Sequence, residues 1–315
     1  MAPTPSAMIL FRPALAPLLA FLLAAPVTAA PALWRFGDAD TTIYLFGTIH
    51  ALPPGYQWQD ARIRKALSTS DTLVVETLID KDPQAIARLF PPPDASLPPI
   101  IERVPPKLRP RFLQQINRAG ITQASLDRMP TWQAAFIMMG ATIKKLGIQR
   151  DAGVEANITP AFEPAAITAT APAARIRKVE ALETASAQLE LFATLPEADQ
   201  RELLAAMVDS QSAARTDYSN LLSDWTNGNQ IAIAKAFEKD EDLTPHLREV
   251  LLRRRNAAWT EWLKKRLDVP GTVFVAVGAG HLAGPLSVRA MLAAEGITVR
   301  RVYNNAALNR ATAGR

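Results

Sequence analysis

Two short stretches at opposite ends of the chain share a pattern that constrains the fold. "YLFGTIHALP" begins at Tyr44, and "FVAVGAGHLAGP" begins at Phe274. In each, an apolar run typical of a buried strand leads into Gly-x-x-His, so that His50 and His281, two of the three histidines, follow a strand. The pattern predicts that both imidazoles lie just beyond the carboxyl ends of strands.

The segments around these motifs follow one plan. Near the N-terminus, "TTIYLFG" (41–47) predicts a strand, "ARIRKAL" from Ala61 a helix and "DTLVVE" (71–76) a second strand. Near the C-terminus, "TVFVAVGAGH", "PLSVRAMLAAEG" and "ITVRRV" repeat the order of strand, helix and strand. We therefore expect an α/β fold whose central sheet is built from N- and C-terminal β-α-β units, each with a strand, a Gly-x-x-His loop, a helix and a strand.

The middle of the chain predicts a large, mostly helical insertion. Residues 90–110 are crowded with prolines and predict surface connections, whereas "MPTWQAAFIMMGATIKKLG" has helical spacing and ends at Gly147. A strand at 175–182 and the helix "ETASAQLELFATL" follow. The helical region then runs to about Leu267, with Thr244 as an N-cap before Pro245.

The first 29 residues read as a secretory signal peptide. They carry one charge, Arg12, followed by an apolar stretch and the small-residue pair Val27 and Ala29, where we expect cleavage. An uncleaved membrane anchor is the alternative, which the prolines and the short apolar length disfavour. The sequence thus predicts a signal peptide (1–29), a single α/β domain (30–315) with no stable membrane span after cleavage, and a periplasmic or secreted protein.

Composition excludes several kinds of chemistry. Because the 315-residue chain has no cysteine, it has no thiolate nucleophile, thiolate metal ligand or disulfide. Its net charge of +5 falls to +4 without Arg12 and is spread along the chain. We interpret "RRR" (253–255) and "KKR" (264–266) as solvated helix faces and expect no nucleic acid partner.

Three side chains follow or end predicted strands, where open α/β sheets hold their ligands: His50, Glu76 and His281. The glycine three residues before each histidine, Gly47 or Gly278, permits a sharp turn and a close approach of another backbone. Two imidazoles and a carboxylate form either a ligand set for a divalent ion or an acid and base pair without metal. The spacing leaves both open.

Other patterns are weaker. "GAGHLAG" has the glycines of a phosphate cradle, Gly278, Gly280 and Gly284, but no acidic residue closes the strand that follows. The absence of Gly-x-Ser-x-Gly disfavours a serine hydrolase. His246, in the first turn of a predicted helix, is expected at the surface.

Several motifs, in order, resemble the TraB/GumN family, which includes the Tiki proteases and is distantly similar to erythromycin esterases and ChaN-like haem-iron proteins. They are "LFGTIH", "LVVE", "GVE" (153–155), "ALETASAQLELF", "RRN" ending at Asn256 and "FVAVGAGHLAG", and the resemblance spans Leu33 to Val302.

The resemblance implies that the two Gly-x-x-His loops and the glutamate line one site of an α/β fold. It implies a metal-dependent protease in which His50, Glu76 and His281 hold a divalent ion (Mn, Co or Zn). Glu155, Glu183, Arg255 and Asn256 match further family positions.

The sequence thus predicts an exported, peptidase-like hydrolase acting on a peptide or small-molecule substrate in the envelope. We expect catalytic roles for His50, Glu76, His281 and Arg255, the last steadying an oxyanion, with substrate-binding or supporting roles for Gly47, Glu155, Glu183, Asn256 and Gly278. The alternative is a non-catalytic periplasmic protein that binds or sequesters a peptide, haem or metal, or an envelope component.

Overall fold

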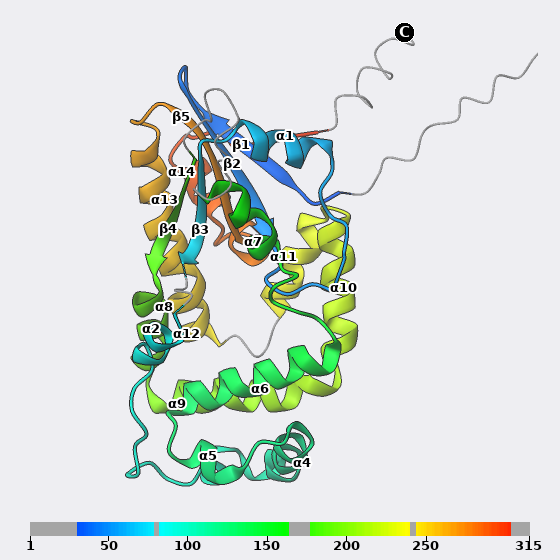
Figure 1. Ribbon diagram of the computed structural model, residues 1–315, viewed down its shortest axis with the longest axis vertical. Helices are drawn as coiled ribbons and strands as arrows, with labels where there is room; N and C mark the ends of the chain where they lie inside the picture. The colour runs from blue at the N-terminus through cyan, green and yellow to red at the C-terminus, as the bar shows by residue number, and fades with distance from the viewer. Residues whose placement is uncertain (1–29, 79–81, 164–176, 240–243, 304–315) are drawn as a thin grey trace, which may run out of the picture.

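The computed structural model describes residues 30–78, 82–163, 177–239 and 244–303, so the predicted signal peptide lies outside the described residues. One six-stranded sheet with the order β4-β3-β5-β2-β1-β6 forms the upper part of the molecule in Figure 1. The strands are β1 (Leu33–Gly37), β2 (Thr41–Thr48), β3 (Thr72–Leu78), β4 (Lys178–Thr184), β5 (Gly271–Gly278) and β6 (Arg300–Arg301).

Strands from opposite ends of the chain are neighbours in the centre of this sheet. β2 pairs with β5 in parallel from Thr41↔Gly271 to Thr48↔Gly278, so the two Gly-x-x-His motifs leave the sheet side by side. β3 lies parallel to β5 on its other side, and β4 lies parallel to β3. The carboxyl ends of these four strands therefore meet at one edge.

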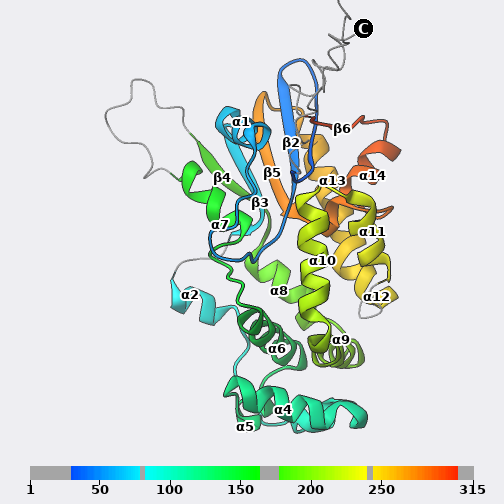
Figure 2. The same cartoon turned by 90° about the vertical axis from the view of Figure 1, so that its right-hand side faces the viewer.

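Helices cover both faces of the sheet. One face packs against α1 (Ala61–Thr69), α7 (Val154–Ile158), the 3-10 turn η2 (Thr159–Phe162), α10 (Ala214–Thr226) and α11 (Gln230–Lys239). The other face packs against α13 (Arg255–Arg266) and α14 (Val288–Ala294). Figure 1 shows α13 to the left of the sheet and α10 and α11 to its right, and Figure 2 turns α10 and α11 toward the viewer.

The remaining helices of the predicted insertion lie mostly below the carboxyl edge of the sheet in Figure 1. They are α2 (Pro83–Arg88), α3 (Ile100–Arg103), α4 (Arg109–Ala119), α5 (Gln123–Asp127), α6 (Thr131–Leu146), α8 (Ala185–Ala193), α9 (Glu197–Asp209) and α12 (Pro245–Arg248). Short turns complete the set: η1 (Pro106–Leu108), η4 (Ser210–Ser212), the π-helix η5 (Glu249–Arg254) and η6 (Ala279–Leu282).

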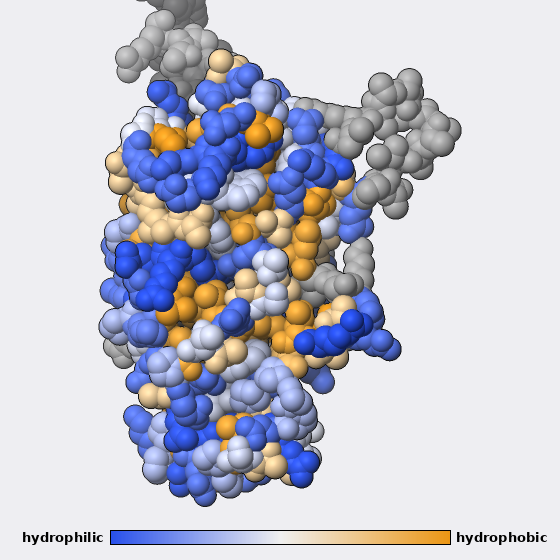
Figure 3. All heavy atoms as spheres, turned by 90° about the vertical axis from the view of Figure 1, so that its left-hand side faces the viewer, coloured by the Kyte–Doolittle hydropathy of each residue, from blue (hydrophilic) through white to orange (hydrophobic). Residues whose placement is uncertain are grey.

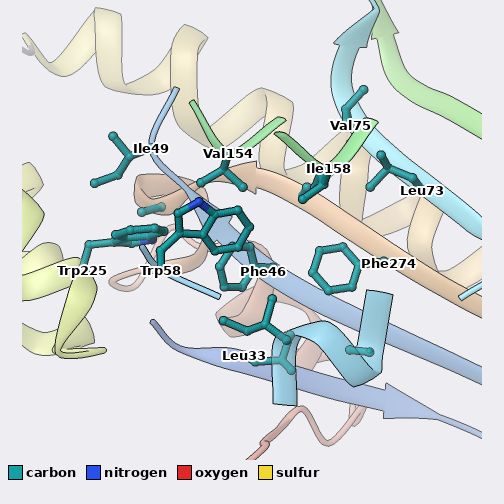
Figure 4. Packing of buried hydrophobic residues seen from close by; sticks show 14 of the residues in the cluster. Leu33, Phe46, Ile49, Trp58, Leu73, Val75, Val154, Ile158, Trp225 and Phe274 are labelled. Atoms are coloured by element: carbon teal, nitrogen blue, oxygen red, sulfur yellow. The ribbon is translucent and has the colours of Figure 1, made fainter. Parts of the chain in front are cut away.

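Apolar side chains from strands and helices make the principal core beside β2. Phe46 stacks on Trp58 with ring centroids 5.5 Å apart and meets Trp225 of α10 edge-on at 6.2 Å. Figure 4 shows these rings with Phe274 of β5, beneath Ile158 of the α7–η2 segment. This packing joins the sheet to the helical insertion because Trp225 belongs to the insertion.

The α/β class with a helical insertion is confirmed, and most predicted elements are found. The helix predicted before Gly147 is α6, and Gly147 ends it with φ of 72°. Thr244 caps α12 as predicted, because its side chain accepts a hydrogen bond from the Leu247 N–H. Residues 175–176 of the predicted fourth strand lie outside the described residues.

Two strands differ from prediction. β1 was not predicted; it returns antiparallel to β2 through a turn in which the Asp38 side chain accepts from the Thr41 N–H. The predicted strand "ITVRRV" is reduced to Arg300–Arg301, because it pairs only with β1, at the edge of the sheet. A strand of two residues at the edge of the sheet is too short to show an alternation of buried and exposed side chains, so the sequence pattern does not mark its length.

We expect Leu45→Ala to lower the free energy of unfolding by about 2–5 kcal/mol, since Leu45 is fully buried in β2 and its truncation leaves a cavity. Leu113→Ala is the matched control, because Leu113 on α4 is 42% exposed and should cost less than about 1 kcal/mol. Urea denaturation of both variants measures the difference. Equal losses would contradict the placement of the core.

Candidate active site

The three side chains predicted at strand ends converge at the carboxyl edge of the sheet. The Oε1 atom of Glu76 lies 3.9 Å from Nε2 of His50 and 3.8 Å from Nε2 of His281. Glu76 and His281 are about nine-tenths buried, whereas the His50 side chain is 61% exposed. The group therefore opens to solvent on the His50 side.

The two motif glycines make this approach possible. A Cβ on Gly47 would stand 3.0 Å from Cα of Ala279, so the two Gly-x-x-His segments touch where a side chain is missing. A Cβ on Gly278 would stand 3.1 Å from Oε1 of Glu76 and 3.2 Å from Nε2 of His50. The close approach of the two backbones was expected. The expected sharp turn is not found at either glycine, since neither has a positive φ.

Glu155 orients His50. Its Oε1 atom lies 2.8 Å from Nδ1 of His50 and also accepts a hydrogen bond from the Thr48 hydroxyl. Desolvation by surrounding atoms disfavours protonation of His50, although the side chain is largely exposed, but the hydrogen bond and charge of Glu155 outweigh it. The pKa of His50 is therefore raised above its ordinary value, and Nε2 is the ring nitrogen directed toward Glu76.

Glu76 is held as a carboxylate. Its Oε1 accepts the Gly278 N–H at 2.6 Å, and its Oε2 accepts from Nη2 of Arg255 at 2.7 Å. Burial acts to raise the pKa of Glu76, but the charges of His281, Arg255 and His50 and the Gly278 hydrogen bond lower it to about 2. Because His281 is neutral at pH 7, the groups that favour the carboxylate there are Arg255, His50 and the Gly278 N–H.

Arg255 is the buried centre of the charged groups. Its guanidinium donates to Glu76 and Glu183, and it stacks over the ring of Trp259 at 4.6 Å. Burial opposes its charge, but the two carboxylates outweigh that effect and raise the pKa of Arg255. Since both carboxylates already share this charge, the structure gives Arg255 a positioning role, and its predicted oxyanion role stays a prediction.

Arg255 also corrects one interpretation. Arg253 and Arg254 are exposed and bind Glu249, as expected of a solvated face. Only 11% of the Arg255 side chain is exposed. Successive residues of a helix face directions about 100° apart, so three arginines in a row cannot share one solvated face. The last member of "RRR" points to the site instead of solvent.

Asn256 fixes the tautomer of His281. Nδ1 of His281 donates to Oδ1 of Asn256 at 2.6 Å, because the Asn256 amide donates in turn to the Leu286 carbonyl. Nε2 of His281 is then free to accept from Nη1 of Arg255 at 3.3 Å. Burial dominates the charges around this ring and lowers the pKa of His281 to about 4. The site thus pairs a neutral imidazole with a readily protonated one.

Helix α10 fixes the loop that carries His50. Trp225 Nε1–H donates to the Gly47 carbonyl at 2.7 Å, and the Tyr218 hydroxyl donates to the Ala51 carbonyl at 2.9 Å. The Tyr56 and Thr226 hydroxyls lie 2.6 Å apart. Together with Thr48, these residues support the site but were missed from sequence. A signal was present for Tyr218 and Trp225, which are aromatic residues with a polar group in the region predicted to be helical.

Two weaker expectations are resolved by packing. The ring of Phe237 fills the space beside Gly280, where a Cβ would stand 2.7 Å from a ring atom, so this glycine makes room for the ring. His246 is 48% exposed and lies 3.5 Å from a carboxylate oxygen of Asp199. It lies at the surface, as expected.

The same side chains are the predicted ligands of a metal ion. Within the described ranges, no group of three His, Asp or Glu side chains has the geometry to hold a metal ion. Arg255 binds Glu76 and approaches Nε2 of His281, so its fixed positive charge stands against two of the three predicted ligands. The arrangement described here does not fit an ion held by all three residues.

We expect Gly278→Ala to fold normally but to lose at least about 100-fold in any activity of this site. The backbone at Gly278 has φ of −49° and ψ of 139°, which alanine adopts readily, while the methyl group would fill the space between Glu76 and His50. Circular dichroism and thermal unfolding would report the fold. Unchanged activity would show that this space is not used.

Stability should depend on pH through His281. Its folded pKa of about 4 lies below the ordinary 6.5, so between these values the unfolded chain binds a proton that the folded protein does not. The contribution of His281 to the free energy of unfolding is therefore at its full value above pH 6.5 and is lost as the pH falls to 4. Glu76 acts in the same direction between 4.5 and about 2, and His50 acts in the opposite direction.

His281→Asn should remove this dependence while keeping an amide donor for Asn256. Between pH 7 and 4, we expect the wild-type protein to lose on the order of 3 kcal/mol more unfolding free energy than the variant. Urea titrations at several pH values after dialysis against EDTA measure both curves. If the unfolding free energies of wild type and variant change equally between pH 7 and 4, His281 is protonated in the folded protein as readily as in the unfolded chain.

Comparison with known proteins identifies the family of the chain. The chain is 25% identical over 257 residues to the proteins named uncharacterized protein YbaP in Escherichia coli (strain K12) and in Shigella flexneri, covering 79% of this chain and 87% of each relative. No solved structure is a significant match. The sequence model of the TraB/PrgY/gumN family matches residues 32–301, which include both histidine motifs and every site residue described above. The chain belongs to the TraB/PrgY/gumN family.

Proposed function

We propose that this protein is a peptidase-like hydrolase that uses His50 to activate water. The observation that carries the proposal is the orientation of His50: Glu155 accepts Nδ1–H, so in the neutral ring Nε2 holds an electron pair directed toward Glu76. A partly exposed imidazole with a raised pKa is a suitable general base near neutral pH. Glu155 would also stabilise the imidazolium that forms when His50 takes the proton.

The position of the water follows from Gly278. The point where a Cβ of residue 278 would stand lies 3.1 Å from Oε1 of Glu76 and 3.2 Å from Nε2 of His50. A Cβ at that point would crowd both acceptors, so glycine leaves them room to hold a water between them, and their separation of 3.9 Å suits a water that donates one hydrogen to each. His281 also borders this region, since its Cδ2 atom would stand 3.6 Å from the same Cβ.

The chain's own residues complete the proposed reaction. The activated water attacks a carbonyl carbon, His50 accepts its proton, and the resulting imidazolium returns a proton to the leaving group. Glu76 remains ionised because Arg255 and the Gly278 N–H hold its charge. No step is assigned to a metal, and the predicted dependence on Mn, Co or Zn is left to experiment.

We also propose that the protein acts outside the cytoplasm. The support is the sequence of residues 1–29, which has the features of a cleavable signal. Within the described residues, no helix has both the length and the apolar character needed to cross a bilayer. Fractionation of cells producing the full chain, with mass spectrometry of the mature N-terminus, tests both the location and cleavage after Ala29.

The activity is tested with the mature protein and a fluorogenic peptide library. We expect turnover that falls at least about 100-fold in His50→Ala and about 100-fold in Glu155→Gln, since each removes part of the base. His246→Ala is the matched control and should keep full activity, because His246 lies on the surface.

Two further arms separate the alternatives. Activity that survives EDTA supports the water mechanism written here, whereas loss on chelation and recovery with Mn²⁺, Co²⁺ or Zn²⁺ would show that a metal takes part. Tight peptide binding without turnover in any condition would contradict the hydrolase and favour the binding protein.

A further inference from the structure

Two arginines stack on one tryptophan ring at the outer edge of the sheet. Trp34 of β1 pairs with Arg301 of β6, and Arg289 lies on α14, on the same side of the molecule in Figure 2. The guanidinium carbon of Arg289 stands 3.5 Å from the centroid of the Trp34 ring, and that of Arg301 stands 5.7 Å from it. Strands β5 and β2 lie between these strands and β3, which carries Glu76. The two arginines, which we call the arginine pair, therefore lie outside the candidate active site.

The arginine pair has no counter-ion. Within the described residues, no carboxylate forms an ion pair with Arg289 or Arg301. Burial and the charge of Arg301 lower the pKa of Arg289 to about 10, so Arg289 is still a cation at neutral pH. The face of an aromatic ring attracts a cation, but one shared ring does not neutralise two positive charges. The pair therefore holds uncompensated positive charge in a partly buried position.

Three N–H groups of the same cluster also lack an acceptor. They are Nε1 of Trp34, Nε of Arg289 and Nε of Arg301, each buried and without a hydrogen-bond partner in the described part of the chain. Arg289 donates from Nη1 to the Leu282 carbonyl at 3.0 Å, whereas the Arg301 guanidinium donates to none of the described residues. Buried polar groups are normally bonded. A water molecule would accept such a hydrogen, but only an anion would also balance the charge.

The chain is shaped around the Arg301 side chain. Gly228, in the turn between α10 and α11, has φ of 63°, and a Cβ on this residue would collide with Nη2 of Arg301. The turn therefore closes directly against the guanidinium, which a glycine permits. The Leu282 carbonyl likewise anchors Arg289. Two cations that are already held in place lose less conformational entropy when a ligand binds.

We propose that Arg289 and Arg301 together bind a phosphate group. A phosphate monoester carries a charge of about −1.5 to −2 at neutral pH, which balances two guanidiniums, whereas a carboxylate balances one. Each planar guanidinium offers paired N–H groups to the oxygens of a phosphate. Trp34 supports both guanidiniums through their stacked faces. This proposal is independent of the proposed hydrolase function.

The phosphate group would belong to a soluble compound or to a lipid head group. Protein surfaces that lie on a membrane place large apolar side chains beside their cations. Figure 3 views the molecule from the side of α13 and shows mainly hydrophilic residues, with scattered hydrophobic ones, over the upper part where the sheet lies. Tyr303, whose ring lies 5.7 Å from Arg301, is exposed and carries a polar hydroxyl. We therefore expect a soluble phosphate compound.

The test compares Arg289→Gln and Arg301→Gln with Arg300→Gln. Arg300 is a matched control because it precedes Arg301 in β6, is exposed, and points to the opposite face of the sheet, so its removal lowers the net charge equally. Each protein would be titrated with inorganic phosphate and with acetate near neutral pH, at constant ionic strength, by isothermal titration calorimetry.

We expect wild type and Arg300→Gln to bind one phosphate per chain with affinities that agree within about 2-fold. Arg289→Gln and Arg301→Gln should bind phosphate at least about 10-fold more weakly, because each loses one guanidinium. Acetate should bind wild type at least about 10-fold more weakly than phosphate. Equal phosphate binding by all four proteins would overturn the site, and equal binding of acetate and phosphate would overturn the phosphate assignment.

Thermal unfolding provides a readout of stability and of folding. Phosphate should raise the Tm of wild type and of Arg300→Gln by several degrees and leave Arg301→Gln nearly unchanged, because a ligand stabilises only the protein that binds it. Without phosphate, Arg301→Gln should unfold at a Tm no lower than that of wild type, since two like charges no longer face one ring. If Arg301→Gln fails to fold, Arg301→Lys, which keeps the charge but loses the paired N–H groups, should show the same loss of binding. Equal rises of Tm in the folded variants would contradict the proposal.

A sedimentation assay distinguishes the two sources of phosphate. Vesicles of phosphatidylglycerol and of phosphatidylcholine would be mixed with wild type and with Arg301→Gln, or with Arg301→Lys if Arg301→Gln fails to fold. We expect neither kind of vesicle to sediment the protein. Sedimentation with phosphatidylglycerol that the Arg301 variant loses, without binding of inorganic phosphate, would overturn the soluble source and assign the site to a lipid head group. Binding of neither inorganic phosphate nor vesicles would overturn the site itself.

Discussion

The parallel pairing of β2 with β5 is the contact on which the site depends. It joins residues more than 200 positions apart, and its register sets Thr48 opposite Gly278, so the two histidine loops leave the sheet together. A shift of one residue would turn every side chain to the opposite face and place the buried Phe46 and Phe274 in the wrong layer. The apolar packing that fixes this register therefore also fixes the distances among His50, Glu76 and His281.

Around this pairing, the charges are arranged so that the two imidazoles differ. His281 is enclosed by Trp259 and Asn256 and faces a guanidinium, so it stays neutral. His50 is open to solvent and bonded to Glu155, so it accepts a proton readily. The two side chains are of the same type, so the difference in their pKa values comes from their burial and from their hydrogen-bond partners.

The helical insertion holds several groups of the site in position. Helix α10 fixes the His50 loop through Trp225 and Tyr218. The start of α13 places Arg255 beside Glu76 and Asn256 beside His281. The sheet therefore brings the reactive groups together, while the insertion orients them.

Local patterns in the sequence determined the α/β class, the strand-end positions of His50, Glu76 and His281, and the caps of α6 and α12, because periodicity, glycine and capping chemistry act over a few residues. Glu155, Glu183, Arg255 and Asn256 were named only through family resemblance, since each meets its partner across the fold. Tertiary structure alone decided that Arg255 is buried while Arg253 and Arg254 are not, that Thr48 and Tyr218 support His50, and that one imidazole is neutral and the other basic. These properties depend on which distant groups surround a side chain and on how much water they exclude, and neither quantity is carried by spacing along the chain.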